Sequence, residues 1–288
     1  MRTGEKIAIS ITIVIALLII VFLWFKPTEF KGREIDAVYK PTVKENSLTP
    51  SVEESETVED KLSFGSVEEA KKYVEEYAEK KGYDINAYPE KLYELMVKDE
   101  TAIDFVLDYP AEINEEHKAV IEKSNDNGRV PLLLQWDKGW GYHQFKNGVV
   151  GLDGCGAVCM SMAAVYLNDD VSLTPDLIAD YASDNGYFVD GSGMSWSFFE
   201  KGVAKYSLKS NSISVNEAKL KQAVENNHPV VVSVREGDFT KKGHYIVIAG
   251  YEDGKYIVND PYSLVNSQKL WSWDRLQPQI KNMWEIYK

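Results

Sequence analysis

The stretch GHYIVIAGYEDGKYIVND (residues 243–260) sets the topology of the C-terminal half of the chain. Its two runs of β-branched and aromatic residues flank the turn sequence Glu252-Asp253-Gly254, a pattern that predicts an antiparallel hairpin. From Val130 onward, helical patterns come first and strand patterns come later. Because helices and antiparallel strands are segregated along the chain, we predict an α+β fold rather than a doubly wound sheet. The expected strands are Pro229–Arg235, His244–Tyr251, Lys255–Asn259 and Lys281–Tyr287.

The length of the hairpin turn determines whether His244 and Asp260 share a face. A two-residue loop, Asp253 and Gly254, puts Asp260 on the face opposite His244. A type I turn followed by Gly254 in the left-handed conformation makes a three-residue loop with a G1 bulge, which shifts the pairing by one residue. Asp260 then lies opposite Ile246, as a diagonal neighbour of His244. We predict the bulged turn.

A second segment, LDGCGAVCMSMA (residues 152–163), places a cysteine between two glycines ahead of small and apolar residues. We predict that Cys155 lies in the first turn of a buried helix. There, unpaired backbone N–H groups and the positive end of the helix dipole stabilise a thiolate. The flanking Gly154 and Gly156 let a substrate backbone approach closely. Cys159, one turn further along, is interpreted as a buried structural cysteine.

His244 is the candidate partner of the thiol. A thiol alone is only slightly ionised at neutral pH, so a neighbouring imidazole is its usual activator. Gly243 leaves the face of His244 open, and Asp260 would orient the imidazole and stabilise its protonated form. Each residue also has a structural interpretation: Cys155 as a buried cysteine, His244 as a satisfied core or edge histidine, and Asp260 as part of a strand-ending Asp-Pro turn.

Together, these motifs resemble the C39-like peptidases, papain-like cysteine peptidases related to those that trim bacteriocin leaders after a double glycine. The resemblance implies a papain-like fold, with a helical subdomain packed on an antiparallel sheet. It implies Cys155 as nucleophile, His244 as general base and then acid, and Asp260 as the orienting residue. It also implies that Gln135 and the Cys155 backbone N–H hold the oxyanion. The segments that carry it are VPLLLQWD (130–137), GCG (154–156), GHY (243–245) and NDP (259–261).

The chain departs from this family in two ways. The transporter-fused members carry membrane and nucleotide-binding domains, whereas this chain has one apolar run and no phosphate loop, so leader trimming coupled to export is not expected. The segment between Gln135 and Cys155 also contains an aromatic, Gly-rich insert, Trp140–His143. This insert and Gly191–Trp196 either wall the substrate cleft, with Trp196 in contact with the substrate, or form ordinary surface loops.

The N-terminal part of the chain predicts a membrane anchor. The run from Ile7 to Phe25 carries no charge and, as a helix, just spans a ~30 Å hydrocarbon core. It lacks a small-x-small cleavage site, so we interpret it as an uncleaved single-pass anchor. The predicted organisation is a short cytoplasmic tail (1–6), the anchor (7–25), a flexible acidic stalk (26–62), a helical lead-in region (63–124) and a peptidase domain (130–288).

The helical lead-in begins with a capping box at Ser66 and Glu69, and its first helix ends at Gly82. A second helical stretch follows Pro89. The lead-in either supports the packing of the main domain or acts as an inhibitory or substrate-positioning segment. Four further helices are expected at Gly154–Leu167, Thr174–Asn185, Ser195–Tyr206 and Asn216–Asn226.

Charge and motif content exclude several partners. The net charge of −13 disfavours nucleic acid, because an acidic chain repels phosphate backbones. No phosphate loop, HExxH or CxxC pattern occurs, so we expect no nucleotide, no metal and no other cofactor. The expected partners are a peptide or protein substrate and, through the N-terminal helix, a membrane.

We therefore predict a membrane-anchored cysteine peptidase that hydrolyses an extracytoplasmic peptide or protein through a thioester. The basic residues on either side of the apolar run nearly balance. The extracellular placement therefore rests on the ability of long C-terminal domains to translocate. Two alternatives remain: a cell-wall amidase or endopeptidase with the same Cys-His chemistry, and an inactive papain-like module that binds peptides or wall polymer.

Overall fold

The computed structural model describes residues 62–122, 128–189, 191 and 193–288. The predicted tail and anchor, and the stalk up to residue 61, lie outside these residues. Within the described ranges, no helix is both long and apolar enough to cross a membrane. The chain divides into two compact units, Met1–Lys40 and Pro41–Lys288, and every described residue belongs to the second.

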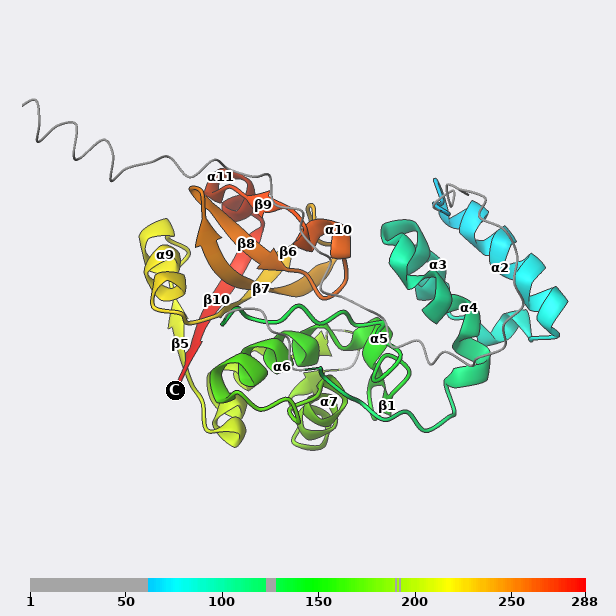
Figure 1. Ribbon diagram of the computed structural model, residues 1–288, viewed down its shortest axis with the longest axis horizontal. Coiled ribbons are helices and arrows are strands. Elements are labelled where there is room, and N and C mark those ends of the chain that lie inside the picture. The colour runs from blue at the N-terminus through cyan, green and yellow to red at the C-terminus, as the bar shows by residue number, and fades with distance from the viewer. Residues whose placement is uncertain (1–61, 123–127, 190, 192) are drawn as a thin grey trace, which may run out of the picture. The chain divides into compact units, whose positions relative to one another are not determined.

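Helices form the N-terminal part of the described chain (Figure 1). The first helix has the predicted ends: Ser66 accepts a hydrogen bond from the Glu69 N–H, and Gly82 adopts the left-handed conformation. The predicted second stretch is divided in two, because Asp99 ends one helix and caps the next turn. These elements are α2 (Val67–Lys81), η1 (Ile85–Ala87), α3 (Glu90–Lys98), η2 (Glu100–Ala102) and α4 (Ile103–Glu112).

The central helix of the main domain is α6 (Cys155–Asn168), in which every residue from Gly156 to Val165 is buried. A helix that is apolar on all sides belongs in a core, and α6 packs against both a neighbouring helix and the sheet. The four helices predicted for this domain are confirmed, and their ends agree to within about a turn. The third, predicted over Ser195–Tyr206, begins as an α-helix and continues as a 3-10 helix. The others are α5 (Val150–Asp153), α7 (Pro175–Asp184), α8 (Trp196–Lys201), η3 (Gly202–Tyr206) and α9 (Glu217–Glu225).

The main domain also contains a six-stranded antiparallel sheet, in the order β5-β10-β6-β7-β8-β9. The α+β class with an antiparallel sheet is therefore confirmed. The four predicted strands are all present, whereas the polar edge strand β5 and the short β9 were not predicted. The strands are β5 (Lys209–Ile213), β6 (Val230–Arg235), β7 (Gly243–Glu252), β8 (Lys255–Asn259), β9 (Leu270–Trp271) and β10 (Ile280–Tyr287).

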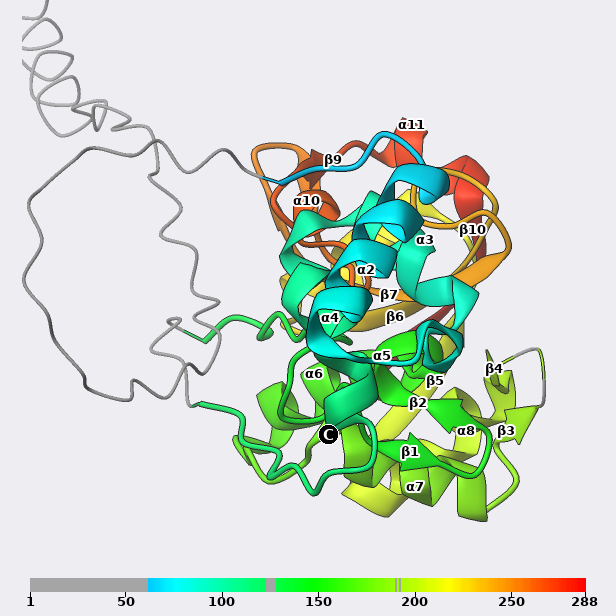
Figure 2. The same ribbon diagram turned by 90° about the vertical axis from the view of Figure 1, so that its right-hand side faces the viewer.

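Several short elements lie in the loops that connect the main helices and strands. Two small hairpins lie outside the main sheet, and two short helices with a 3-10 turn follow β8 and β9. Figure 2 shows the hairpins near α7 and α8. They are β1 (Gln144–Phe145) with β2 (Gly148–Val149), β3 (Phe188–Val189) with β4 (Gly193–Met194), α10 (Leu264–Ser267), α11 (Trp273–Leu276) and η4 (Gln277–Gln279).

The sheet has a hydrophobic core on each face. Tyr245 and Val247 of β7 pack into the core that contains α6, while Ile246 and Ile248 pack into the core that contains α9. This alternation follows from the two-residue period of a strand. Within the sheet, β7 therefore packs against α6, the helix that begins at Cys155.

The turn between β7 and β8 differs from the prediction. Asp253 and Gly254 both have positive φ angles, 52° and 77°, and Glu252 pairs with Lys255. The loop therefore has two residues, as in a type I′ turn, whose twist matches that of the flanking strands. The predicted three-residue loop with Gly254 as a G1 bulge is wrong.

The register at the far end of the hairpin is nevertheless the predicted one. The pairing shifts by one residue at Ala249, which forms a bulge inside β7, and Val247 then pairs with Asn259. Continued by one residue, this register makes Asp260 a diagonal neighbour of His244. The bulge in the strand supplies the shift that we had assigned to the turn.

Candidate active site

Cys155 is the first residue of α6, and its side chain is only partly buried. Its position exposes it to backbone N–H groups of the first turn, which lack partners within the helix. Cys159 lies one turn further along and has no exposed surface. Burial, together with the nearby Cys155, raises the pKa of the Cys159 thiol well above its usual value. Cys159 is therefore a buried structural residue, as predicted.

The imidazole of His244 pairs with Asp260 and lies near Cys155. Its Nε2 atom lies 2.7 Å from Asp260 Oδ1, and the Cys155 side chain is near enough to the ring to shift its pKa. Because Nε2 is used by the carboxylate, Nδ1 is the ring nitrogen that is left for the thiol. Burial alone lowers the pKa of His244, but Asp260 and Cys155 together raise it to about 9. The charged imidazolium is thus favoured at neutral pH.

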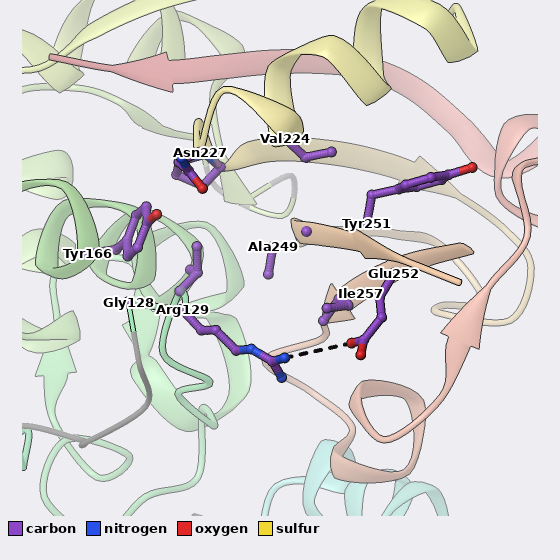
Figure 3. A pocket seen from close by; sticks show the side chains of 12 residues that line it. Gly128, Arg129, Tyr166, Val224, Asn227, Ala249, Tyr251, Glu252 and Ile257 are labelled. Atoms are coloured by element: carbon purple, nitrogen blue, oxygen red, sulfur yellow. Dashed lines mark ion pairs between the residues drawn. The ribbon is translucent and has the colours of Figure 1, made fainter. Parts of the chain in front are cut away.

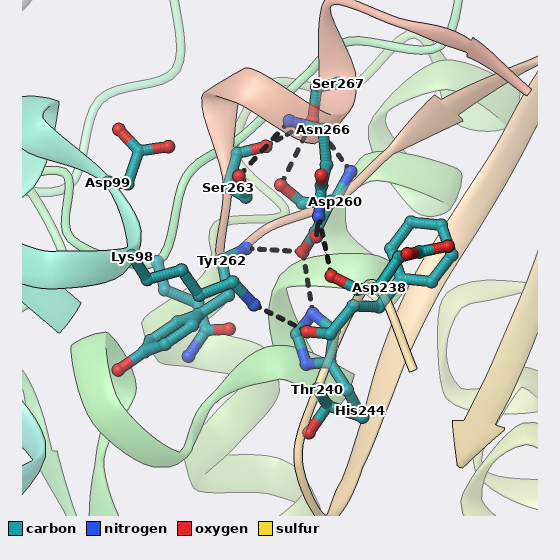
Figure 4. Close-up of polar contacts among 12 residues, drawn as sticks. Lys98, Asp99, Asp238, Thr240, His244, Asp260, Tyr262, Ser263, Asn266 and Ser267 are labelled. Carbon is teal, nitrogen blue, oxygen red and sulfur yellow. Dashed lines mark hydrogen bonds and ion pairs between the residues drawn. The ribbon is translucent and has the colours of Figure 1, made fainter. Parts of the chain in front are cut away.

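Asp260 is fully buried and held on several sides (Figure 4). Its Oδ2 atom accepts a hydrogen bond of 2.9 Å from Asn266 Nδ2, and its Oδ1 atom accepts one of 2.9 Å from the Tyr262 N–H. Its own backbone N–H donates to Ser267 Oγ at 2.9 Å. These contacts come from α10 and the loop before it, so both segments position the carboxylate.

The charge of Asp260 is stabilised by its surroundings. Burial by itself raises the pKa of this carboxyl group, whereas the charge and hydrogen bond of His244 lower it. The charge of Lys98 and the amide of Asn266 add to this effect, and the net pKa is below the usual value. Lys98 belongs to α3, and its Nζ atom lies 5.1 Å from the ring centre of Tyr262. That ring in turn lies 6.1 Å from the ring of His244.

Gln135 lies in a buried turn and is 1% exposed. Its backbone N–H donates to the carbonyl of Pro261 at 2.8 Å, directly beside Asp260. Its Nε2 atom donates to the Val150 carbonyl at 3.2 Å, which leaves one hydrogen of the amide for another acceptor. The Oε1 atom is buried and has no hydrogen-bond partner among the described residues.

The two glycines beside Cys155 are required by packing within the protein. A Cβ atom at Gly154 would lie 2.6 Å from the Val150 carbonyl oxygen, and one at Gly156 would lie 2.8 Å from Met194 Cβ. Both distances are too short for a side chain. The need for glycine at these positions therefore does not depend on a substrate, and the predicted substrate contact stays a prediction.

The other two predicted substrate contacts lie at the surface. Gly243 is exposed, and a Cβ atom there would meet only the Val234 carbonyl, at 3.9 Å. The Trp196 side chain is 43% exposed and packs edge-on against Trp284, with 5.7 Å between ring centres. Both remain open to a ligand.

The aromatic insert Trp140–His143 does not form an ordinary surface loop. Trp140 and Tyr142 are almost fully buried. Tyr142 stacks on Phe105 of α4, with 4.5 Å between ring centres, and donates to the Phe105 carbonyl at 3.1 Å. The Phe105 ring also occupies the space that side chains at Gly141 and Gly151 would need. The insert therefore anchors the lead-in helices to the main domain.

Three residues that the sequence did not single out act on the site: Asn266 and Tyr262, which donate hydrogen bonds to Asp260, and Lys98, whose charge lowers the pKa of Asp260. Asn266 could have been found from the capping pattern Ser263-x-x-Asn266, in which Ser263 accepts the Asn266 N–H. Lys98 is an ordinary helix lysine in the sequence, and nothing there marks its contact.

A separate pocket of about 240 Å³ lies at the other end of β7 (Figure 3). Arg129 and Glu252 form an ion pair of 3.8 Å at this pocket, and Tyr166 and Asn227 also line it. None of the predicted site residues reaches it. In the described part of the chain, no group of three or more His, Cys, Asp or Glu residues could hold a metal ion.

Several solved structures are similar to part of this chain. One is the peptidase domain of Streptococcus ComA, described as a bi-functional ABC transporter involved in a quorum sensing pathway: identity is 19%, coverage is 47% of this chain and 90% of that chain, and the TM-score is 0.37. Another is a putative C39-like peptidase from Bacillus anthracis, with 14% identity, coverage of 60% and 99%, and a TM-score of 0.33. No curated protein matches the chain.

The family comparison is more extensive. The model of the Peptidase_C39 like family matches residues 128–288, which is more than half of the chain. The matched segment begins close to the resemblance found in the sequence and includes Gln135, Cys155, His244 and Asp260. This protein is therefore a member of the Peptidase_C39 like family.

Proposed function

We propose that this protein is a membrane-anchored cysteine peptidase that hydrolyses peptide bonds of an extracytoplasmic peptide or protein. The observation that carries the proposal is the position of partly exposed Cys155 near the imidazole of His244, whose Nε2 atom is hydrogen-bonded to buried Asp260. Membership of a peptidase family supports the type of reaction. The uncharged run from Ile7 to Phe25 supports the anchor.

In the acylation step, the Cys155 thiolate attacks the carbonyl carbon of the scissile bond and forms a C–S bond. The carbonyl oxygen becomes an oxyanion, which accepts hydrogen bonds from the Cys155 backbone N–H and the free hydrogen of Gln135 Nε2. His244 Nδ1 then gives its proton to the leaving amine as the C–N bond breaks. The products of this step are a free amine and a thioester.

In the deacylation step, neutral His244 takes a proton from water, and the resulting hydroxide attacks the thioester carbon. The C–S bond breaks, the carboxylic acid leaves, and the thiolate and imidazolium are restored. Asp260 stabilises the imidazolium at both stages, in agreement with the raised pKa of His244.

The nucleophile can be tested with the two cysteines of the chain. The full-length protein in detergent is incubated with a peptidyl electrophile, and labelling and peptide hydrolysis are measured in wild type, Cys155→Ala and Cys159→Ala. We expect both signals to vanish in Cys155→Ala and to persist in Cys159→Ala, because the Cys159 thiol has no exposed surface. Labelling that survives in Cys155→Ala but disappears in Cys159→Ala contradicts the assignment.

The substrate class can be tested by profiling the same protein against peptide and muropeptide libraries. Cleavage of peptides supports the proposal, and cleavage of wall fragments alone supports a cell-wall amidase or endopeptidase. Binding without turnover supports an inactive module. The extracellular placement is tested by protease treatment of intact cells, which should remove a C-terminal tag.

A further inference from the structure

Asp99 connects the lead-in helices to the main domain. It is 1% exposed, and its two carboxylate oxygens have different partners. Oδ1 accepts hydrogen bonds from Thr101 N, at 3.1 Å, and Thr101 Oγ1, at 2.6 Å. Oδ2 accepts one of 2.6 Å from the backbone N–H of Leu264 and a longer one of 3.4 Å from Val265. One oxygen thus caps η2, and the other holds the start of α10.

The helix that Asp99 holds is the one that positions the buried carboxylate of Asp260. Asn266 Nδ2 donates to Asp260 Oδ2 at 2.9 Å. Ser267 Oγ accepts from the Asp260 N–H at 2.9 Å and contacts the Asp260 carbonyl at 3.2 Å. Direct contacts therefore run from Asp99 through α10 to Asp260 and then to His244. Figure 4 shows the part of this chain of contacts that surrounds Asp260.

The residue before Asp99 makes a second contact with the same region. Lys98 Nζ donates to the carbonyl of Phe239, in the loop between β6 and β7, at 2.5 Å. The neighbouring carbonyl of Asp238 accepts a hydrogen bond of 3.4 Å from Asn266 Nδ2, the same amide that binds Asp260. Lys98 and Asp99, at the end of α3, therefore hold the loop between β6 and β7 and the start of α10.

We propose that Asp99 is a positioning residue of the peptidase site, and that the helical lead-in completes this site from outside the family segment 128–288. This inference rests on the proposed function. Asp99 touches none of the reacting atoms; it acts by fixing α10 and, through it, the orientation of Asp260 toward His244. A lead-in that only supports packing would change stability and leave the ionisation of His244 unaltered.

The ionisation of His244 can be measured directly by NMR. The chain has only four histidines, and the His244 signal of histidine-labelled, full-length protein is assigned by its loss in His244→Gln. Asp99→Ala removes the acceptor. Leu264→Pro removes the closer of the two donors from the other side, at the first position of α10, where proline fits because the preceding Ser263 is extended. We expect each variant to lower the pKa of His244 by about one unit.

The matched control is Asp84→Ala. Asp84 caps η1 by accepting the Asn86 N–H, as Asp99 caps η2, but the structure gives it no hydrogen bond to the main domain in the described part of the chain. We expect Asp84→Ala to leave the pKa of His244 unchanged. Asp99→Asn is the conservative variant. Its oxygen can still accept the Leu264 N–H while its amide donates to Thr101 Oγ1, so we expect a smaller decrease than in Asp99→Ala.

An unchanged pKa of His244 in both Asp99→Ala and Leu264→Pro overturns the inference, as does an equal decrease in Asp84→Ala. If Asp99→Ala does not fold, Leu264→Pro and Asp99→Asn answer the same question. The proposed function fails separately, through the absence of Cys155 labelling and hydrolysis in wild type. The histidine titration needs no turnover, so the two failures can be told apart.

Discussion

The carboxylate of Asp260 and the imidazole of His244 meet at 2.7 Å where almost no solvent reaches them. Asp260 is 0% exposed and His244 is 8% exposed. In such a place, water cannot replace a lost counter-charge, so each group depends strongly on the other. The pKa of His244 therefore reports directly on the presence and position of Asp260.

Asp260→Asn removes the charge and keeps the shape of the side chain. We expect the pKa of His244 to fall below about 9, because burial, which lowers it, is then opposed mainly by Cys155. The imidazolium exists below this pKa, so the alkaline limb of the kcat/KM profile should move to lower pH. Activity near neutral pH should fall on the order of 10²-fold. A pH-rate profile measures both effects, and an alkaline limb that stays near pH 9 contradicts the pairing.

The hairpin that carries this pair was predictable because strand residues and an Asp-Gly turn are local signals. The turn type was not. Both a two-residue and a three-residue loop suit the sequence Glu252-Asp253-Gly254, and the choice between them was wrong. The register at His244 still agrees with the prediction because Ala249 supplies the extra residue inside β7. Nothing in the sequence marks a bulge at an alanine, since this bulge depends on how the whole sheet twists.

The site residues also differ in how well the sequence predicts them. Cys155 at a helix start and His244 at a strand start carry recognisable chemistry in their own surroundings. Asp99 does not, because its partner Leu264 lies 165 positions away. The helix α10 has only four residues, too few for a hydrophobic period. Contacts of this kind arise from packing between distant segments, which a single sequence does not show.

Gln135 offers a test of the oxyanion site. Gln135→Ala should lower kcat about 10²–10³-fold, because the remaining donor is the Cys155 backbone N–H. Alkylation of Cys155 by iodoacetamide involves no oxyanion and should proceed at the wild-type rate. Gln144→Ala is the control, since this exposed glutamine donates to the Ile113 carbonyl, away from the site. Parallel losses of alkylation and hydrolysis in Gln135→Ala would mean that the substitution disturbs Cys155 itself.

Phe105 is the anchor that holds α4 against the aromatic insert. Phe105→Ala removes a ring that is 1% exposed and stacked on Tyr142, so we expect a loss of about 3–5 kcal/mol in unfolding free energy. Phe64→Ala is the comparison, because Phe64 is only partly buried and contacts Tyr73 within the lead-in. The decrease in unfolding free energy should be clearly smaller for Phe64→Ala than for Phe105→Ala. Denaturant unfolding measures both, and equal costs would mean that the insert contributes little to anchoring.

Lys98 should contribute to stability through the charge of Asp260. Lys98→Met removes a charge that lowers the pKa of Asp260 and a hydrogen bond to the Phe239 carbonyl. A lowered carboxyl pKa stabilises the fold above the pKa of the unfolded state, and this stabilisation is lost as pH falls through the folded-state pKa. We therefore expect Lys98→Met to lower the unfolding free energy by about 1–2 kcal/mol at pH 7, and by less as the solution is made acidic.

The pH dependence of that loss separates the charge from the packing of Lys98. Lys98→Arg keeps the charge and should keep most of the stability at pH 7. Lys91→Met is the control at the other end of α3: Lys91 is exposed and paired with Asp153, and an exposed pair contributes at most about 1 kcal/mol. Thermal unfolding at pH 7 and in acid measures all three. A destabilisation by Lys98→Met that is the same at both pH values would assign Lys98 to packing alone and leave Asp260 to be stabilised by His244 and Asn266.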